Sequence, residues 1–300
     1  MTPLQRYIVE EIAADHADGL LPRREALRRL GLLGVGATAA AALLAACSSD
    51  EQTTNPVTST TDSPAPTPPG MSTAVLTTPV TFPGPDGREL QGAWAPAAQP
   101  RGAVLVIHEN KGLTDHIRSV TGRFAGVGYS ALAVDLLSEA GGTAVFTDPA
   151  AATAALGKIP QEQLVADLRA GIDELERRAP GKKIGATGFC FGGGLVWLLL
   201  TSGTPKLAAA TPFYGPFPDN GDVSGSTAAV LAVYAALDAR VDASRPGAEA
   251  ALQRAGLPHE VFVAPDADHA FFNDTGPRYN QTAANEAWRR VLDWYGTRLS

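Results

Sequence analysis

The stretch at residues 183–200, KIGATGFCFGGGLVWLLL, decides how the rest of the chain is interpreted. Residues 184–187 form a short apolar run that predicts a strand, and residues 195–200 form an apolar run compatible with a helix. The segment between them predicts a sharp turn, because Gly188 and Gly192 let the strand and the helix approach each other closely. One cysteine, Cys190, therefore lies at the apex of a strand–turn–helix unit, beside the backbone N–H groups that open the helix.

The pattern Gly-x-Cys-x-Gly resembles the nucleophile elbow of α/β-hydrolases, with cysteine in place of the usual serine. A helix N-terminus at that point favours a thiolate or an oxyanion. The alternative is a buried structural cysteine in a glycine-rich turn, since free cysteines are commonly buried and inert. A nucleotide-binding loop is disfavoured, because neither a G-x-G-x-x-G motif nor a Walker lysine is present here.

Composition places the chain among ordinary globular proteins. It has 300 residues, of which 45% are hydrophobic and 18% are charged. The net charge of -7 argues against a nucleic-acid partner, which requires a concentrated basic face. The chain has 2 cysteines, Cys47 and Cys190, and we do not expect them to form a disulfide.

Residues 1–46 are predicted to be an export signal that lies outside the fold. Arg23 and Arg24 belong to a PRREALR segment that resembles a twin-arginine motif, and an apolar stretch follows at residues 30–46. That stretch is short and weakly hydrophobic for a membrane-spanning helix, as signal sequences are. It ends in Leu-Ala-Ala-Cys, which resembles a bacterial lipobox and implies cleavage before Cys47 and lipidation of its sulfur. The chain is then exported and anchored to the cell envelope membrane; the alternative is an uncleaved single-pass anchor.

Residues 47–70 are predicted to be a disordered tether, because Ser, Thr and Pro dominate and large apolar residues are nearly absent. Everything after it, residues 71–300, is expected to form one domain.

Within this domain, strands and helices alternate along the chain. Strands are expected at residues 75–81, 89–94, 103–108, 129–134, 184–187, 207–213, 228–236 and 260–263, and helices at residues 117–127, 161–178, 195–200, 244–255 and 282–298. This alternation predicts an α/β fold with a doubly wound, mostly parallel sheet and helices on both faces. Functional residues of such a sheet lie at the carboxyl ends of its strands.

Three chemically apt residues follow predicted strands: Cys190, Asp238 and His269. Their chain order of nucleophile, acid and histidine is the order of α/β-hydrolase triads. The histidine takes the proton of the thiol, and the aspartate orients the imidazole and stabilises its charged form. Asp266 and Asp268 are rival acids, but they lie too close to His269 in sequence to orient it easily. A metal site made of these two and His269 matches no strong ligand spacing.

From about residue 73 onward the chain resembles the dienelactone hydrolase family. The segments that carry the resemblance are VIHENKG at 106–112, AVDL at 133–136, GFCFGG at 188–193, Asp238, and HAF at 269–271. The resemblance covers nearly all of the predicted domain and implies the α/β-hydrolase fold. The export signal and the tether lie outside it.

The resemblance also implies a set of site residues. Cys190, His269 and Asp238 match the family's catalytic triad, and Glu109 matches a carboxylate that contacts the thiol and helps to ionise it. The backbone N–H groups of Phe191 and Asn110 match the oxyanion hole. Neither a cofactor nor a metal is expected, and the expected partner is a small-molecule ester or lactone.

One position departs from the family pattern. The founding enzymes have an arginine four residues past the histidine, where it helps to bind the carboxylate of the substrate; this chain has Asn273 there, and Arg278 could partly replace that arginine. The sequence therefore predicts a hydrolase of esters, lactones or thioesters and leaves dienelactone itself open. The alternatives are a peptidase or acyltransferase on the same fold, or a non-catalytic lipoprotein that binds an envelope partner.

Overall fold

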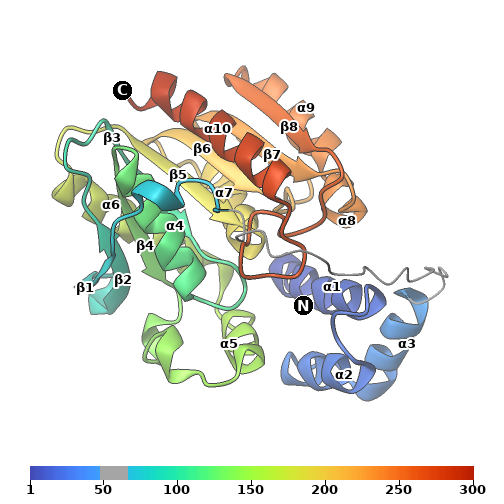
Figure 1. The fold of residues 1–300 in the computed structure, drawn as a ribbon. Coiled ribbons are helices and arrows are strands. Elements are labelled where there is room, and N and C mark those ends of the chain that lie inside the picture. The colour runs from blue at the N-terminus through green and yellow to red at the C-terminus, as the bar shows by residue number, and fades with distance from the viewer. Residues whose placement is uncertain (48–66) are drawn as a thin grey trace.

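The computed structural model describes residues 1–47 and 67–300 (Figure 1). The predicted tether falls, at residues 48–66, outside the described residues.

The centre of the fold is an 8-stranded sheet with the order β1-β2-β4-β3-β5-β6-β7-β8. β1 and β2 pair antiparallel with each other, β2 pairs antiparallel with β4, and the remaining neighbours are parallel. The strands are β1 (Thr78–Pro83), β2 (Glu89–Ala95), β3 (Gly102–Ile107), β4 (Tyr129–Asp135), β5 (Ile184–Phe189), β6 (Leu207–Phe213), β7 (Ala229–Ala235) and β8 (His259–Ala264). This is the predicted doubly wound, mostly parallel sheet.

Helices cover both faces of the sheet (Figure 1). A Cβ at Gly185 would lie 3.3 Å from Tyr295 of α10, whereas one at Gly188 would lie 3.0 Å from Val196 of α7. Positions an odd number of residues apart on a strand face opposite sides, so α10 and α7 lie on opposite faces. The helices of the domain are α4 (Asp115–Gly126), α5 (Pro149–Leu156), α6 (Gln161–Arg178), α7 (Phe191–Thr201), α8 (Ala239–Asp242), α9 (Arg245–Ala255) and α10 (Gln281–Arg298), with 3₁₀ turns at Met71–Thr73, Pro85–Gly87, Ser138–Ala140 and Thr143–Val145.

The register of the central strands brings two predicted site segments together. Every residue of β3, β4, β5 and β7 is buried, as expected for strands covered on both faces. β3 pairs parallel with β5, and Ile107 lies opposite Gly188. The loop that begins at His108 and the turn at Cys190 therefore leave the same edge of the sheet side by side.

The predicted elements agree with the structure to within a few residues in most cases. α6 and β6 have the predicted bounds, while β1 begins at Thr78 and α4 begins at Asp115. α5, an alanine-rich helix capped by the side chain of Asp148, is absent from the predicted elements, because its small residues carry little helical periodicity.

The N-terminal residues 1–47, predicted to be an export signal, form helices in the structure, and their role as a signal stays a prediction. Residues 1–47 form α1 (Pro3–Ala17), α2 (Arg23–Leu32) and α3 (Ala37–Cys47), which pack together and against the domain (Figure 1). The physical reason is the apolar face of α1: Leu4, Ile8 and Ile12 recur every fourth residue and are buried. Among the described residues, no helix has the length and apolar character needed to cross a membrane.

Two contacts fasten these helices to α5. The Gln5 side chain donates a hydrogen bond to the Gly157 carbonyl at 2.6 Å, and Arg28 of α2 pairs with Asp148 at 2.7 Å. The N-terminal helices therefore belong to the same packed body as the sheet.

Candidate active site

The turn at Cys190 has the geometry that its glycines predict. β5 ends at Phe189, α7 begins at Phe191, and Cys190 between them has φ 58° and ψ −117°, a strained backbone conformation for a non-glycine residue. A Cβ at Gly188 would lie 2.2 Å from the Gly192 carbonyl oxygen, and one at Gly192 would lie 2.4 Å from that of Ile107. Both positions therefore require glycine, which confirms the predicted strand–turn–helix unit.

Asp238 and His269 form a buried pair at the same edge of the sheet. Asp238 follows β7 and caps α8, where one carboxylate oxygen accepts a hydrogen bond from the Val241 backbone N–H at 3.2 Å. Its other oxygen lies 2.5 Å from Nδ1 of His269. Burial opposes the charged form of the histidine, but the hydrogen bond and the charge of Asp238 raise the pKa of His269 above its usual value. The aspartate thus orients the ring and leaves Nε2 pointing away from it.

The rival acids have other partners. Asp268 accepts a hydrogen bond from the backbone N–H of His269 at 2.6 Å and pairs with Arg278 at 3.1 Å. The backbone carbonyl of Asp266 accepts from the Asn280 side chain. Of the three aspartates, Asp238 is the one that contacts the imidazole.

The thiol of Cys190 is hydrogen-bonded by side chains of α1, within the predicted export signal. Sγ lies 3.2 Å and 3.4 Å from the two carboxylate oxygens of Glu11, and 3.3 Å from the hydroxyl of Tyr7. The same hydroxyl lies 3.3 Å from Nε2 of His269. Among the described residues, the side chains that hydrogen-bond the sulfur are therefore those of α1, with Tyr7 between the thiol and the imidazole.

This environment disfavours the thiolate. Burial, followed by the negative charges of Glu11 and Glu109, holds the pKa of the Cys190 thiol well above its usual value. The Tyr7 hydroxyl and the Phe191 backbone N–H hydrogen-bond the sulfur and act in the opposite direction. In this arrangement the cysteine is a protonated thiol at neutral pH.

Among the described residues, no hydrogen bond joins Glu109 to the thiol. One of its carboxylate oxygens accepts a hydrogen bond from the Asn273 side chain at 2.7 Å, and the other is buried without a hydrogen-bond partner among the described residues. The carboxylate that contacts the sulfur is Glu11 instead. Glu109 follows β3 at the sheet edge, as predicted, and is close enough to raise the pKa of the thiol through its charge.

The remaining predicted residues surround this centre. Asn110 is buried in the loop after β3, and Phe191, whose backbone N–H reaches the sulfur, is the first residue of α7. Arg278 is engaged by α1, where it pairs with Asp15 at 2.7 Å and with Asp18. It is therefore not free to replace the missing family arginine while α1 is in place.

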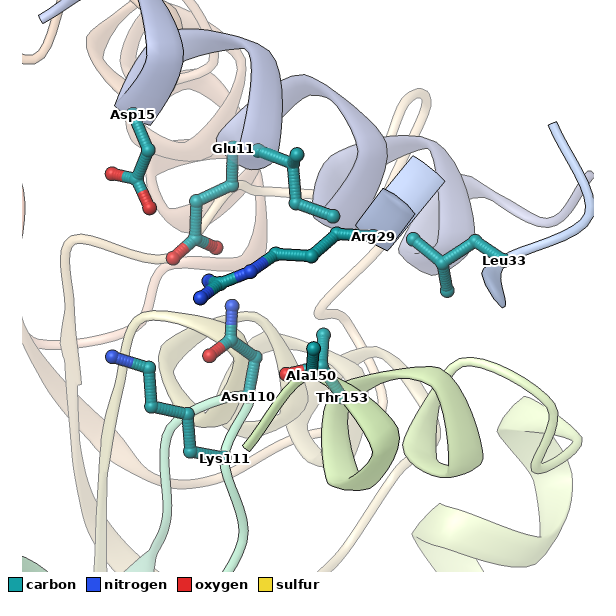
Figure 2. Close-up of a pocket in the computed structure, with 9 residues that line it drawn as sticks. Glu11, Asp15, Arg29, Leu33, Asn110, Lys111, Ala150 and Thr153 are labelled. Atoms are coloured by element: carbon teal, nitrogen blue, oxygen red, sulfur yellow. The ribbon is translucent and has the colours of Figure 1, made fainter. Parts of the chain in front are cut away.

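A cavity of about 230 Å³ opens beside the cysteine, and its lining includes Cys190, His269, Glu11, Arg29 and Lys111. Figure 2 shows an adjoining pocket, in which Glu11 and Arg29 extend from the N-terminal helices toward Asn110 and Lys111 of the loop after β3. Glu11 and Tyr7 are not among the site residues predicted from the sequence. The signal that could have found them is the i, i+4 apolar spacing of residues 4, 8 and 12, which predicts a packed helix.

One group of metal-ligand atoms comes together in the described part of the chain. The ligand atoms of Glu11, Cys190 and His269 all lie within 4.8 Å of one another. A carboxylate, a thiolate and an imidazole suit a zinc-like ion by type. The group differs from the Asp266, Asp268 and His269 set that was considered from sequence, and it uses the cysteine and the histidine of the elbow.

The sheet order, the strained turn before α7 and the Asp238–His269 pair define an α/β-hydrolase. The model of the dienelactone hydrolase family matches residues 92–299. The chain belongs to this family, and it is a hydrolase of ester or lactone bonds.

Known proteins agree with this assignment. A protein of Escherichia coli O157:H7 named "Putative carboxymethylenebutenolidase" is 32% identical over 209 residues, which cover 65% of this chain and 77% of that protein. A protein of the same name from Saccharolobus solfataricus is 30% identical over 242 residues, which cover 69% of this chain and 93% of that protein. The crystal structure titled "Putative Dienelactone Hydrolase" from Klebsiella pneumoniae has a TM-score of 0.65 at 29% identity and covers 74% of this chain and 98% of its own.

Proposed function

We propose that the protein hydrolyses a small ester, lactone or thioester through Cys190, His269 and Asp238. The observation that carries the proposal is the buried Asp238–His269 pair, at 2.5 Å, beside the one cysteine at the apex of the elbow. This arrangement has the parts that nucleophilic acyl transfer requires: a nucleophile, a base and a group that orients the base.

The chemistry follows from these positions. Nε2 of His269 takes the thiol proton as Sγ attacks the carbonyl carbon, and the carbonyl electrons move onto the oxygen. The N-terminus of α7, with the Phe191 N–H at the sulfur, stabilises the developing oxyanion. The imidazolium then protonates the leaving alcohol or thiol, and a water molecule that gives its proton to His269 hydrolyses the thioester formed on Cys190.

The substrate class is tested with the purified full chain. Panels of p-nitrophenyl esters, lactones and thioesters are assayed beside the Cys190→Ala variant. We expect turnover of at least one class by the wild type and none by the variant. Turnover that survives in Cys190→Ala would show that another group is the nucleophile.

A peptidase on the same fold is the second candidate activity. It is separated from an esterase by the leaving group, since peptide p-nitroanilides require protonation of a much poorer leaving group than p-nitrophenolate. A preference for anilides over esters in the same assay would favour the peptidase. The third candidate, a non-catalytic lipoprotein that binds an envelope partner, is supported if every substrate fails while the chain binds envelope material.

We also propose that the chain is exported through a twin-arginine signal and anchored to the cell envelope by lipid on Cys47. Cleavage before Cys47 would remove α1 and α2 and nearly all of α3 from the anchored protein, so these helices would cover the site only in the uncleaved chain. The supporting residues are Arg23, Arg24 and the Leu-Ala-Ala-Cys segment ending at Cys47. Packing of α1–α3 on the domain is compatible with a route that carries folded proteins. Cys47→Ala should abolish lipid labelling and membrane association. Lysine at both arginine positions should block export, and mature protein that still reaches the envelope would favour the general secretion route.

A further inference from the structure

We propose that Glu11 and Tyr7 are positioning residues that hold the Cys190 thiol in a resting state in the uncleaved chain, and that α1 must move away, or be removed with the export signal, before acyl transfer. In this arrangement α1 acts as an internal ligand that competes with substrate for the cysteine. The inference rests on the proposed cysteine chemistry, but it can be measured without an ester substrate.

The contacts of the sulfur support this assignment. A thiol that is ready for attack donates its proton toward the base, here Nε2 of His269. The shortest hydrogen bond of Sγ among the described residues is instead that to Glu11, at 3.2 Å, and the Tyr7 hydroxyl lies 3.3 Å from both the sulfur and Nε2. The thiol proton is thus held by a carboxylate of α1, and a hydroxyl of α1 separates the nucleophile from its base.

The same atoms occupy the space that a substrate requires. A carbonyl carbon about to be attacked lies roughly 3–3.5 Å from the nucleophile. The oxygens of Glu11 and Tyr7 lie within that range of the sulfur, on the side that faces His269. Cys190 is 2% exposed and His269 is 5% exposed. A substrate carbonyl therefore cannot take up this position between sulfur and imidazole while both side chains remain there.

Charged contacts anchor α1 in this place. Arg278, which follows the His269 segment, pairs with Asp15 at 2.7 Å and with Asp18 at the end of the helix. The guanidinium of Arg240 lies 4.5 Å from the ring centre of Tyr7, and this half-buried side chain also lies near Glu11 and Asp238. Displacement of α1 would release Arg278 at the edge of the cavity, where it could meet a substrate carboxylate. Arg278 would then pair either with the aspartates at the end of α1 or with the substrate carboxylate, so substrate binding would favour the displacement of α1.

The displacement of α1 moves no proton between groups. The sulfur keeps its proton when Glu11 departs, and the S–H donor turns from the carboxylate oxygen to Nε2 of His269. Proton transfer to the imidazole accompanies the later attack on the carbonyl. No group beyond those already named is required.

The test compares Glu11→Gln with Glu10→Gln, a matched change one residue along the same helix. Among the described residues, Glu10 makes no hydrogen bond to the sulfur, so its variant controls for the loss of one charge from α1. Iodoacetamide alkylation of Cys190 is followed at several pH values. Removing a neighbouring negative charge typically lowers a pKa by about one unit or more. We therefore expect about tenfold faster alkylation for Glu11→Gln at neutral pH and a wild-type rate for Glu10→Gln.

Kinetics with an ester give an independent readout. If α1 competes with substrate, Glu11→Gln should lower KM several-fold and leave kcat unchanged, because a smaller fraction of the enzyme is blocked. Tyr7→Phe, which removes only the hydroxyl, should lower KM by less. It should slow alkylation, because the hydrogen bond from this hydroxyl lowers the pKa of the thiol. A lower kcat with unchanged alkylation would instead make Glu11 part of the reaction and overturn the proposal. Faster alkylation without ester turnover in any form of the enzyme would preserve the role of α1 and contradict the proposed hydrolysis.

Discussion

Nδ1 of His269 lies 2.5 Å from a carboxylate oxygen of Asp238, although the two residues are 31 positions apart and follow different strands. Strands β7 and β8 are parallel neighbours, so the segments that follow them leave the sheet at the same edge. The pair sets both the direction of the imidazole and its affinity for a proton.

Asp238→Asn should move the pH dependence of the reaction. The histidine must be neutral to act as a base, so activity falls as the pH drops below its pKa. Asp238 raises that pKa, and its removal should shift the acidic limb of the kcat/KM profile to lower pH. Loss of orientation should lower kcat by about 10²–10⁴-fold. A profile that keeps its midpoint would assign the pH dependence to another group.

Replacement of the nucleophile should have the largest effect. Cys190→Ala should abolish both ester turnover and iodoacetamide labelling, and Cys190→Ser should retain little turnover because a hydroxyl is far harder to ionise than a thiol. Far-UV circular dichroism of both variants serves as the control for folding. Cys47 also reacts with iodoacetamide when it carries no lipid, so labelling is mapped by peptide mass spectrometry.

Glu109→Gln removes the negative charge of Glu109 and keeps the size of its side chain, so it tests the effect of the charge alone. The amide keeps the shape of the side chain, while loss of a negative charge should lower the pKa of the Cys190 thiol and speed its alkylation. If Glu109 accepts a proton once α1 has left, turnover should nevertheless fall by about 10²–10⁴-fold. Full turnover in this variant would reduce Glu109 to a hydrogen-bond partner of Asn273.

Gly192→Ala should destabilise the fold at the elbow. Its Cβ would lie 2.4 Å from the Ile107 carbonyl oxygen and 2.6 Å from that of His108, which are backbone atoms with little room to shift. We expect a loss of about 1–3 kcal/mol or more in the free energy of unfolding, measured with urea. Gly296→Ala in α10 is the matched control, because nothing lies within 4 Å of its Cβ, and it should stabilise the protein by about 0.5–1 kcal/mol.

Asp274 should make stability depend on pH below 4. Arg123, which is fully buried, donates to both oxygens of Asp274 at 2.8 Å and 3.0 Å, and His116 lies 2.7 Å away. Burial opposes the charge of Asp274, but these partners lower its pKa from 3.8 to about 2. A lowered pKa gives stability that is complete above the unfolded value and is lost as the pH falls through the folded value. The contribution is about 2 kcal/mol.

The same residue can be tested by substitution. Asp274→Asn leaves the buried Arg123 without its charged partner and should cost about 3–5 kcal/mol. Urea unfolding at pH 7 and at acidic pH measures both effects. Equal stability of the wild type and the variant at pH 7 would show that the pair contributes nothing to the fold.

The domain fold and three of its site residues could be predicted from local sequence. A buried parallel strand is a continuous apolar run, so β3 and β5 can be predicted from a few adjacent residues. The turn between β5 and α7 can be predicted in the same way, because a position with no room for a Cβ requires glycine, as at Gly188 and Gly192. Strand ends then place Asp238 and His269 near Cys190, because parallel strands finish at the same edge.

The role of α1 was not predicted, because the spacing of its apolar residues predicts a packed helix but does not identify the surface against which the helix packs. The recurrence of Leu4, Ile8 and Ile12 indicates a helix with one apolar face, but the surface that this face covers lies more than a hundred residues away in sequence. The resemblance of residues 22–47 to an export signal predicts a leader and carries no information about the surface that α1 covers.

The sequence by itself determined the sheet, the elbow and the Cys190, Asp238 and His269 set, since each follows from periodicity, turn chemistry and strand ends. Only the tertiary structure decided what touches the thiol: Glu11 and Tyr7 rather than Glu109. The physical reason is that a hydrogen bond depends on where two segments dock. Docking is set by the summed burial and charge of whole surfaces, which no short stretch of sequence contains.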